Sequence, residues 1–186
     1  SLAIVMNTIR RVAILGGNRI PFVRSNTAYV RASNQDMLTA ALQGLVDRFD
    51  LHGVRLGEVA AGAVMKHSRD FNLVRESVLG TTLARETPAY DIQQACGTGL
   101  EATILVANKI ALGQIECGVA GGVDTTSDAP IALNDRLRTL LLDLYRAKSL
   151  LRRLGVASRI RPGMLDRKST RLNSSHTDIS RMPSSA

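Results

Sequence analysis

Cys96 is the residue of this 186-residue chain best placed for nucleophilic chemistry. It follows Tyr90–Ile92, which is typical of the end of a short strand, and it opens a predicted helix that runs to about Leu112. A thiol at a helix start faces unpaired backbone N–H groups and the positive end of the helix dipole. Both stabilise a thiolate, the form in which a cysteine attacks. A small buried hydrophobe is the alternative interpretation, and the more common role of an isolated cysteine.

The residues beside Cys96 leave space for a substrate. Gly97 and Gly99 keep the surroundings of the sulfur free of side chains. The helix that follows is apolar on nearly every side, which predicts that it is sunk in a core. Its apolar surface is interrupted by Glu101, Asn108 and Lys109. The second cysteine, Cys117, lies in or beside an apolar strand and away from any helix start, so we interpret it as inert core.

Strands and helices alternate through the first two thirds of the chain. Strands are predicted at Val12–Leu15 (short and buried), Glu58–Met65, Tyr90–Ile92 and Cys117–Gly121. Helices are predicted from the N-cap Ser33 to Phe49, over Asn72–Arg85 and over Cys96–Leu112. Successive strand–helix–strand units cross right-handed and give a mainly parallel sheet, so the predicted fold class is α/β. Ligands of such sheets gather at the carboxyl ends of strands, and Cys96 follows one of these ends.

Composition argues against several classes of function. An apolar fraction of 45% suits one domain with a sizeable core. The sequence has no metal-ligand spacing, no P-loop and no Ser-His-Asp arrangement, and an aromatic content of 3% argues against a nucleic-acid partner. Two cysteines, without a secretory signal or a long apolar run, predict a soluble, cytoplasmic protein of a reducing compartment.

The net charge of +8 is concentrated in one segment. Residues 1–134 balance 12 Lys/Arg against 12 Asp/Glu, whereas residues 135–165 carry eight basic and two acidic side chains. A local basic patch indicates an anionic partner. A solvated basic helix face, touching an acidic protein or a membrane surface, explains the same charges.

Several motifs resemble the amino-terminal half of the thiolase family. The motifs are ACGTGLEA at Ala95–Ala102, GVAGGVD at Gly118–Asp124, VAILGGNRIPF at Val12–Phe22, NLVR at Asn72–Arg75, and Pro130. They occur in order between roughly Arg10 and Leu165. Asp124 stands where many members have glutamate, and Gly97-Thr98 replaces a commoner Ala/Ser pairing. The leucine- and arginine-rich run after Pro130 is most similar to thiolases that work beside a hydratase/dehydrogenase subunit in fatty-acid oxidation.

This resemblance implies acyl transfer between coenzyme A thioesters on a thiolase-like fold. Cys96 would attack the keto carbon of a 3-ketoacyl-CoA, acetyl-CoA would leave, and CoA would then release the shortened acyl group. CoA would be a co-substrate, with no tightly bound cofactor. Arg152 and Arg153 are the candidates to bind the CoA phosphates, because an arginine fork suits phosphate. The complete enzyme would be a dimer or tetramer, with a hydratase/dehydrogenase subunit as a further partner.

The family also requires a histidine of a Gly-His-Pro motif and a second cysteine of a Cys-x-Gly motif. Neither motif occurs before Leu165, and His67 is expected in a solvent-facing loop. The chain by itself is therefore expected to be inactive. A ketoacyl synthase shares the fold and a cysteine at the same helix start, and is the nearest enzymatic alternative. A non-catalytic, thiolase-like protein that binds acyl-CoA or lipid is the other alternative.

The resemblance also sets the expected domain boundaries. Residues 1–5 read as upstream read-through before Met6, residues 6–130 as the thiolase amino-terminal core, and residues 131–165 as the truncated start of a CoA-binding loop domain. Residues 166–186 break from this pattern, and back-translation of Asp166–His176 gives the string of a common sequencing adapter. We therefore interpret the tail as non-native and expect the natural chain to continue past about Leu165.

Overall fold

The computed structural model describes residues 9–128, 130 and 135–160, so the tail after Leu165 lies outside the described residues. The chain divides into two compact units, Ser1–Ala129 and Pro130–Ala186. The first unit contains α1 (Asn34–Arg48), β1 (Glu58–Ala61), the 3-10 turn η1 (Ser68–Asp70), α2 (Leu73–Leu79), β2 (Ala89–Asp91), α3 (Thr98–Ala111) and β3 (Gly118–Ala120). The second contains α4 (Asp135–Arg146) and α5 (Leu150–Ala157).

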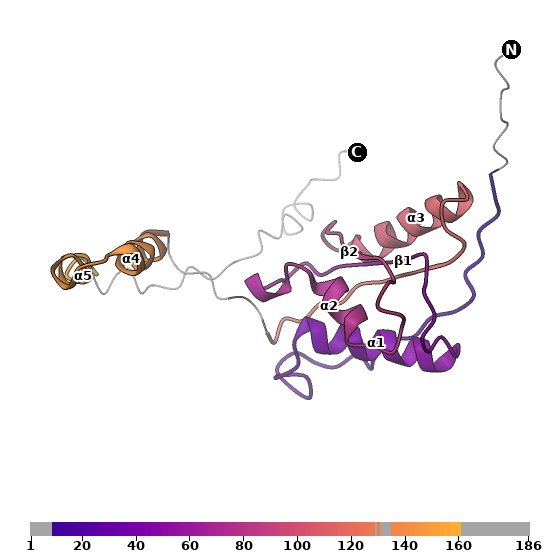
Figure 1. The fold of residues 1–186 in the computed structure, drawn as a ribbon. Coiled ribbons are helices and arrows are strands. Elements are labelled where there is room, and N and C mark those ends of the chain that lie inside the picture. Colours follow the sequence, from indigo (N-terminus) through magenta and orange to yellow (C-terminus); the bar gives the residue numbers. More distant parts are fainter. Residues whose placement is uncertain (1–8, 129, 131–134, 161–186) are drawn as a thin grey trace, which may run out of the picture. The chain divides into compact units, whose positions relative to one another are not determined.

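A three-stranded parallel sheet of order β2-β1-β3 forms the centre of the first unit. Successive side chains of a strand point to opposite faces. In the fully buried β1, Val59 and Ala61 accordingly pack into a core with α1 and α2, whereas Ala60 packs against α3. Figure 1 shows α1 and α2 on one side of the sheet and α3 on the other. The predicted α/β class with a parallel sheet is confirmed.

Helix α1 begins as the sequence predicts. Ser33 is its N-cap, and a capping box joins the Ser33 hydroxyl to the Asp36 N–H and the Asp36 carboxylate to the Ser33 N–H. The hydrogen bonds from the backbone and the hydroxyl of Ser33 lower the pKa of Asp36. The apolar face of the helix supplies the buried residues Met37, Leu38, Leu42 and Val46.

The predicted strand over Val12–Leu15 is wrong. This segment has no secondary structure, and Ile14 and Leu15 are 85% and 86% exposed. A strand needs a partner for its backbone groups. The nearby backbone bond joins the Arg10 N–H to the Ala111 carbonyl (2.9 Å), at the end of α3, and not to a strand.

Two other elements are shorter than predicted. β1 ends at Ala61 and does not reach Met65, because the N–H groups of Val64 and Met65 turn to the carboxylate of Asp124. α2 ends at Leu79 and does not reach Arg85, because the Gly80 N–H closes the last helical turn. β2, β3 and α3 lie within one or two residues of their predicted bounds.

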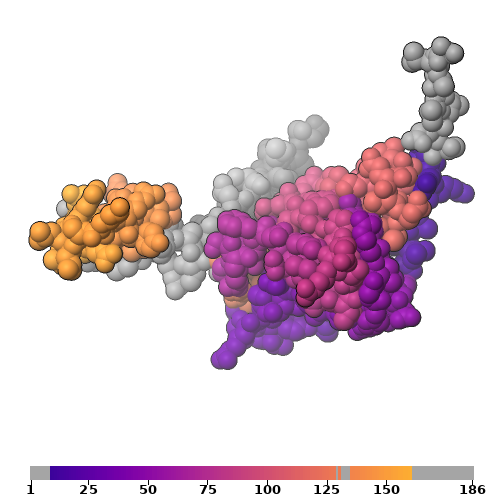
Figure 2. Space-filling view, in the orientation of Figure 1, coloured from indigo at the N-terminus to yellow at the C-terminus, as the bar shows by residue number. Residues whose placement is uncertain are grey.

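Helix α3 is buried on one side only. Ala102 and Val106 pack against Ala60 of β1, whereas Leu100 and Ile104 are 69% and 43% exposed. The outer side of α3 lies on the surface of this unit in the space-filling view (Figure 2). The expectation of a helix sunk on all sides is therefore wrong for this unit, because the described residues cover one face and leave the other to solvent.

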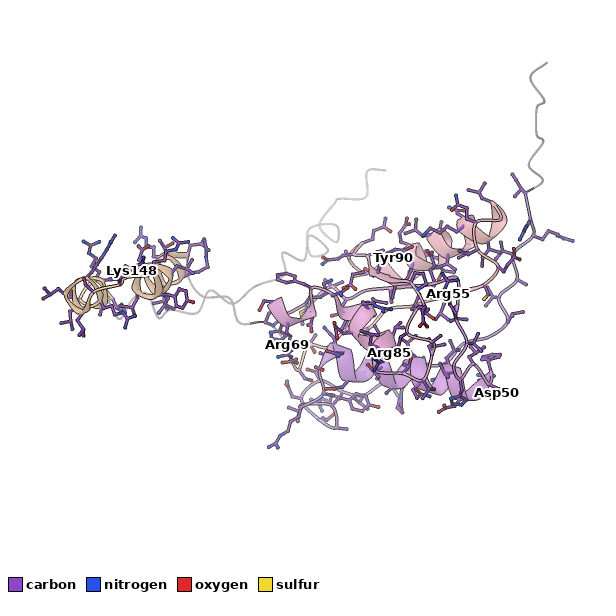
Figure 3. All side chains as sticks on the ribbon, in the orientation of Figure 1. Asp50, Arg55, Arg69, Arg85, Tyr90 and Lys148 are labelled. Carbon is purple, nitrogen blue, oxygen red and sulfur yellow. The ribbon has the colours of Figure 1, made fainter. Side chains whose placement is uncertain are left out.

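A buried carboxylate fastens α3 to the sheet. Glu58 of β1 forms an ion pair with Lys109 of α3 and accepts a hydrogen bond from the Tyr90 hydroxyl (3.2 Å). The Lys109 ammonium also lies 5.0 Å from the centre of the Tyr90 ring. Tyr90, labelled in Figure 3, packs with Ala102 and Val106 of α3. Desolvation and the Glu58 charge raise the pKa of Tyr90, and the bond to Glu58 raises the pKa of Lys109.

The second unit is a hairpin of α4 and α5. The Ser149 hydroxyl caps α5 by accepting the Arg152 N–H (3.3 Å), and the buried Ala147 lies in the connection. Large apolar side chains remain exposed on both helices: Tyr145, Leu150, Leu151 and Leu154. Among the residues that the structure describes, no helix has the length and apolar character needed to cross a bilayer.

We predict that the first unit loses stability at alkaline pH through the cluster of Glu58, Tyr90 and Lys109. A group whose pKa is raised by folding binds its proton more tightly in the folded state, so its contribution is complete below its unfolded pKa. For Tyr90 and Lys109 the contribution is lost as the pH rises above about 10.

The measurement is urea unfolding of the chain between about pH 8 and about pH 11.5. Glu58→Gln should lower stability at pH 8 and flatten the alkaline decline. Tyr145→Phe removes an exposed phenol and should keep the wild-type slope. An equally steep decline in Glu58→Gln would contradict the prediction.

Candidate active site

Cys96 lies at the carboxyl end of β2 and directly before Gly97, the N-cap of α3. Its side chain is exposed. The structure therefore places the predicted nucleophile at the edge of a parallel sheet where ligands bind. The alternative interpretation of a buried hydrophobe does not hold in this unit.

A tight turn carries Cys96 from the strand into the helix. The Gly97 N–H donates to the Gln94 carbonyl (2.9 Å), and Ala95 has a φ of +44°. That is the left-handed region, which residues with a Cβ atom rarely adopt. The Thr98 hydroxyl accepts the Gln94 N–H (2.9 Å) and donates to the Ala95 carbonyl (2.8 Å).

The start of α3 leaves backbone donors available beside the thiol. Gly97 cannot cap the helix with a side chain. Within residues 9–128, no acceptor is bonded to the N–H groups of Cys96, Gly99 and Leu100. Such donors, with the positive end of the helix dipole, can hold an oxyanion that develops next to the sulfur.

Four glycines lie around this helix start, and one of them, Gly62, has no room for a side chain. They are Gly62 after β1, Gly99 in α3, and the pair Gly121-Gly122 after β3. A Cβ atom at Gly122 would lie 3.4 Å from the Gly62 carbonyl oxygen and 3.7 Å from the Gly99 Cα. A methyl group at Gly62 would overlap the carbonyl of Ile92. The ends of the strands and the start of α3 therefore meet backbone to backbone.

Asp124 fixes the loop that follows β1. Its two carboxylate oxygens accept the N–H groups of Val64 (3.1 Å) and Met65 (3.0 Å). The Gln93 amide donates to the Val64 carbonyl (3.2 Å), which ties the same loop to the segment just before Cys96. The aspartate at position 124, in place of the commoner glutamate, thus has both carboxylate oxygens hydrogen-bonded.

The motif at Asn72–Arg75 supports the sheet and makes no contact with Cys96. Asn72 is the N-cap of α2, and the Arg75 guanidinium donates to the carbonyls of Thr87 (2.8 Å) and Arg85 (2.7 Å). Asp91 at the end of β2 accepts the Val74 N–H (2.8 Å) and pairs with Lys66 (2.7 Å). These contacts hold α2 against the strand that leads to the thiol.

His67 is not the solvent-facing residue that the sequence predicts. Its Nε2 lies 2.9 Å from the Asp128 carbonyl oxygen and 3.2 Å from the Asp128 carboxylate, with 23% of the side chain exposed. Arg69 also pairs with Asp128. His52 contacts Thr82 and Asp47. Within residues 9–128, neither histidine contacts Cys96, and no group of metal-ligating side chains is found.

Cys117 is exposed and therefore not the core residue that the sequence indicates. It lies one residue before β3, where its carbonyl accepts the Gly57 N–H (3.1 Å). β3 has three half-buried residues and pairs with β1 on one side, so neighbouring strands do not enclose the residue that precedes it. The chain thus has two exposed thiols, and Cys96 is the one at a helix start.

Arg152 and Arg153 lie in the first turn of α5 and have different roles there. The Arg153 Nε donates to the Ala147 carbonyl (3.0 Å), which closes the connection between α4 and α5. Among the described residues, no acidic side chain pairs with Arg152, which is exposed. A hollow of about 440 Å³ in this unit is lined instead by Asp135, Arg136, Thr139, Leu140 and Arg159.

Sequence reasoning did not assign roles to Thr98 and Asp124. Both entered only as departures from a family pattern. Asp124 contacts residues about 60 positions away, whereas Thr98 contacts Gln94 and Ala95 in the turn just before it. A hydroxyl two residues after a candidate nucleophile, at a helix start, is the signal that identifies Thr98. An acidic residue directly after a Gly-Gly-x segment is the corresponding signal for Asp124.

Comparisons with known proteins agree with this geometry. Residues 12–181 match the family model described as the thiolase N-terminal domain, a range that includes most of the tail. A 3-ketoacyl-CoA thiolase of Colwellia psychrerythraea is 34% identical over 154 residues, and the alignment covers 83% of this chain and 35% of the relative. The mitochondrial trifunctional enzyme subunit beta of Homo sapiens is 36% identical over 153 residues, with 82% and 32% covered.

A solved structure supports the fold. The acetyl-CoA acetyltransferase of Bacillus anthracis superposes with a TM-score of 0.64 at 28% identity, over 68% of this chain and 32% of that protein. The chain spans about a third of the length of the curated relatives it matches.

We predict that Gly62→Ala destabilises the first unit. The added methyl group would meet the Ile92 carbonyl, and overpacking of this kind costs about 1–3 kcal/mol. Urea unfolding measures the change in the free energy of unfolding. Gly121→Ala is the matched control, since no atom lies within 4 Å of its Cβ position. Equal stability of the two variants would show that the backbone is not tightly packed at Gly62.

Proposed function

The chain belongs to the thiolase family, and we propose that it carries the nucleophile of a thiolase-type acyltransferase. The observation on which this rests is the exposed Cys96 at the start of α3, after the carboxyl end of β2 and among backbone donors. The related 3-ketoacyl-CoA thiolases support a 3-ketoacyl-CoA substrate.

Two steps transfer the acyl group. The Cys96 sulfur bonds to the keto carbon, the carbon–carbon bond breaks, and acetyl-CoA leaves after its enolate is protonated. The thiol of a second CoA then attacks the acyl-Cys96 thioester, and the sulfur of Cys96 leaves with the electron pair. Covalent catalysis divides one difficult cleavage into two easier steps, and the reverse sequence is a condensation.

The chain's own backbone assists both steps. Each attack places negative charge on the oxygen of the acyl group. The N–H of Cys96, with those of Gly99 and Leu100, is available to stabilise that charge. The proton transfers require a base and a second acid/base, and in the described residues neither His52 nor His67 contacts the thiol. We therefore expect no thiolysis from this chain alone.

The same proposal extends to the cofactor, oligomeric state, location and partner of the enzyme. CoA is a co-substrate, and no cofactor is tightly bound. The complete protein is a homodimer or tetramer in the cytoplasm. The trifunctional enzyme relatives support a hydratase/dehydrogenase subunit as its partner in fatty-acid oxidation.

We predict that the complete enzyme containing this chain carries its acyl group on Cys96. Rapid quenching after addition of a 3-ketoacyl-CoA, followed by peptide mass spectrometry, should locate the adduct. Cys96→Ser should lower turnover by orders of magnitude, because a serine hydroxyl is hardly ionised at neutral pH. Cys117→Ser is the matched control and should retain activity, since Cys117 is exposed but lies away from any helix start. An adduct on Cys117 alone would refute the assignment.

We predict that Arg152 contributes to binding of the CoA phosphates. Arg152→Glu should raise the Michaelis constant for CoA in the complete enzyme, most clearly at low salt, where charges are least screened. Arg153 is less suited to this test because its side chain also holds the Ala147 carbonyl.

Arg138→Glu is the control for the charge reversal, because Arg138 pairs with Asp135 on the same helix (3.5 Å). A change in the Michaelis constant that is equal in both variants would indicate a general effect of charge. No change in either would assign Arg152 to a solvated helix face.

A further inference from the structure

The Thr98 side chain closes the turn that carries Cys96, and we propose that Thr98 is a positioning residue for the Cys96 thiol. The functional meaning of this role rests on the proposed acyl transfer. The geometry itself belongs to the chain and can be tested without turnover.

The turn adopts a conformation that needs support. Ala95 has a φ of +44°, and Ala95 directly precedes the thiol. A residue with a Cβ atom holds such a conformation only where its surroundings determine it. The backbone contributes the bond from Gly97 to Gln94 (2.9 Å) and a longer one from the Thr98 N–H to the Ala95 carbonyl (3.3 Å).

The Thr98 hydroxyl supplies the remaining bonds on both sides of Ala95. It accepts the Gln94 N–H (2.9 Å) and donates to the Ala95 carbonyl (2.8 Å). Thr98 is 5% exposed, so water competes little for these bonds. Cys96 lies between the bonded groups, and its backbone is therefore fixed from both directions.

The methyl group of Thr98 anchors the hydroxyl. A Cβ atom at Gly62 would lie 3.0 Å from the Thr98 Cγ2, so the methyl group fills the space beside the end of β1. The two branches of this side chain thus have separate functions. Thr98→Val keeps the packing and removes the hydrogen bonds, whereas Thr98→Ser keeps the hydrogen bonds and removes the packing.

Alkylation of the full chain by iodoacetamide tests the role, with Cys117 as an internal reference in the same molecule. Peptide mass spectrometry gives the rate at each cysteine. Thr98→Val should lower the ratio of the Cys96 rate to the Cys117 rate by about five-fold, because the sulfur is no longer held at the helix start. Thr98→Ser should keep the ratio within about two-fold of the wild type. Thr103→Val is the control: it removes a hydroxyl bonded to the Gly99 carbonyl (2.8 Å) in the same helix and should leave the ratio unchanged.

An unchanged ratio in Thr98→Val, or an equal loss in Thr98→Ser, would overturn the proposal and leave Thr98 a packing residue. If Thr98→Val does not fold, Ala95→Gly provides the second test. Glycine adopts a positive φ without steric cost, so Ala95→Gly with Thr98→Val should fold and restore the ratio to within about two-fold. Failure of the double variant to fold, or a ratio that stays low, would also overturn it. An acyl adduct absent from Cys96, with these ratios as expected, would refute the proposed acyl transfer and not the positioning.

Discussion

The close approach of backbone to backbone at Gly62 is the constraint on which the first unit depends. Gly62 directly follows the central strand, and both neighbouring segments bond at this point: the Ile92 N–H donates to the carbonyl of Ala61, the last residue of β1 (2.8 Å), and the Val123 N–H donates to the Gly62 carbonyl (3.0 Å). A Cβ atom at Gly62 would overlap the Ile92 carbonyl, so no side chain fits at this position. The start of α3 can therefore lie directly over the ends of the strands, which brings Cys96 to the edge of the sheet. The same crowding that limits the sequence to glycine also fixes the position of the thiol.

Helix α3 is held near both of its ends by contacts of different kinds. At its start, Thr98 packs over Gly62 and bonds the preceding turn. Near its end, Lys109 pairs with the buried Glu58, and small apolar contacts to Ala60 lie between these points. A buried carboxylate without a partner is costly, so the pair fixes the rotation of the helix about its axis. A nucleophile directly before the N-terminus of a helix that is fixed in this way needs little reorganisation before it attacks.

The sequence predicts those structural features that depend on local chemistry or on the spacing of apolar residues. The capping box of Ser33 and Asp36, the alternation of strands with helices and the place of Cys96 after a strand are all local features, and the structure contains them. Periodicity shows which residues are apolar but not what covers them. The segment Val12–Leu15 reads as a strand yet pairs with none of the described strands, and α3 reads as buried yet exposes Leu100.

Contacts that depend on the path of the backbone were outside the reach of the sequence. His67 reads as a loop residue because nothing near it in the chain shows that Asp128, 61 positions away, contacts its ring. The hydroxyl of Thr98 has a role only once Ala95 is known to have a positive φ. In both cases the missing information is the backbone path, which brings polar groups together without any repeat or spacing in the sequence.

The exposed side of α3 matters both for the stability of the helix and for the proposed chemistry. Leu100 and Ile104 are four residues apart and so lie on one side of α3, which begins two residues after Cys96. Leu100 is 69% exposed and Ile104 43% exposed, and an apolar surface of this kind favours association. Under the proposed function, an acyl thioester on Cys96 must also be kept from water, because hydrolysis would compete with transfer to CoA. Cys96, Leu100 and Ile104 are all exposed in this unit. The helix start that bears the thiol and the apolar side of α3 therefore both require cover, the first for the proposed chemistry and the second for stability.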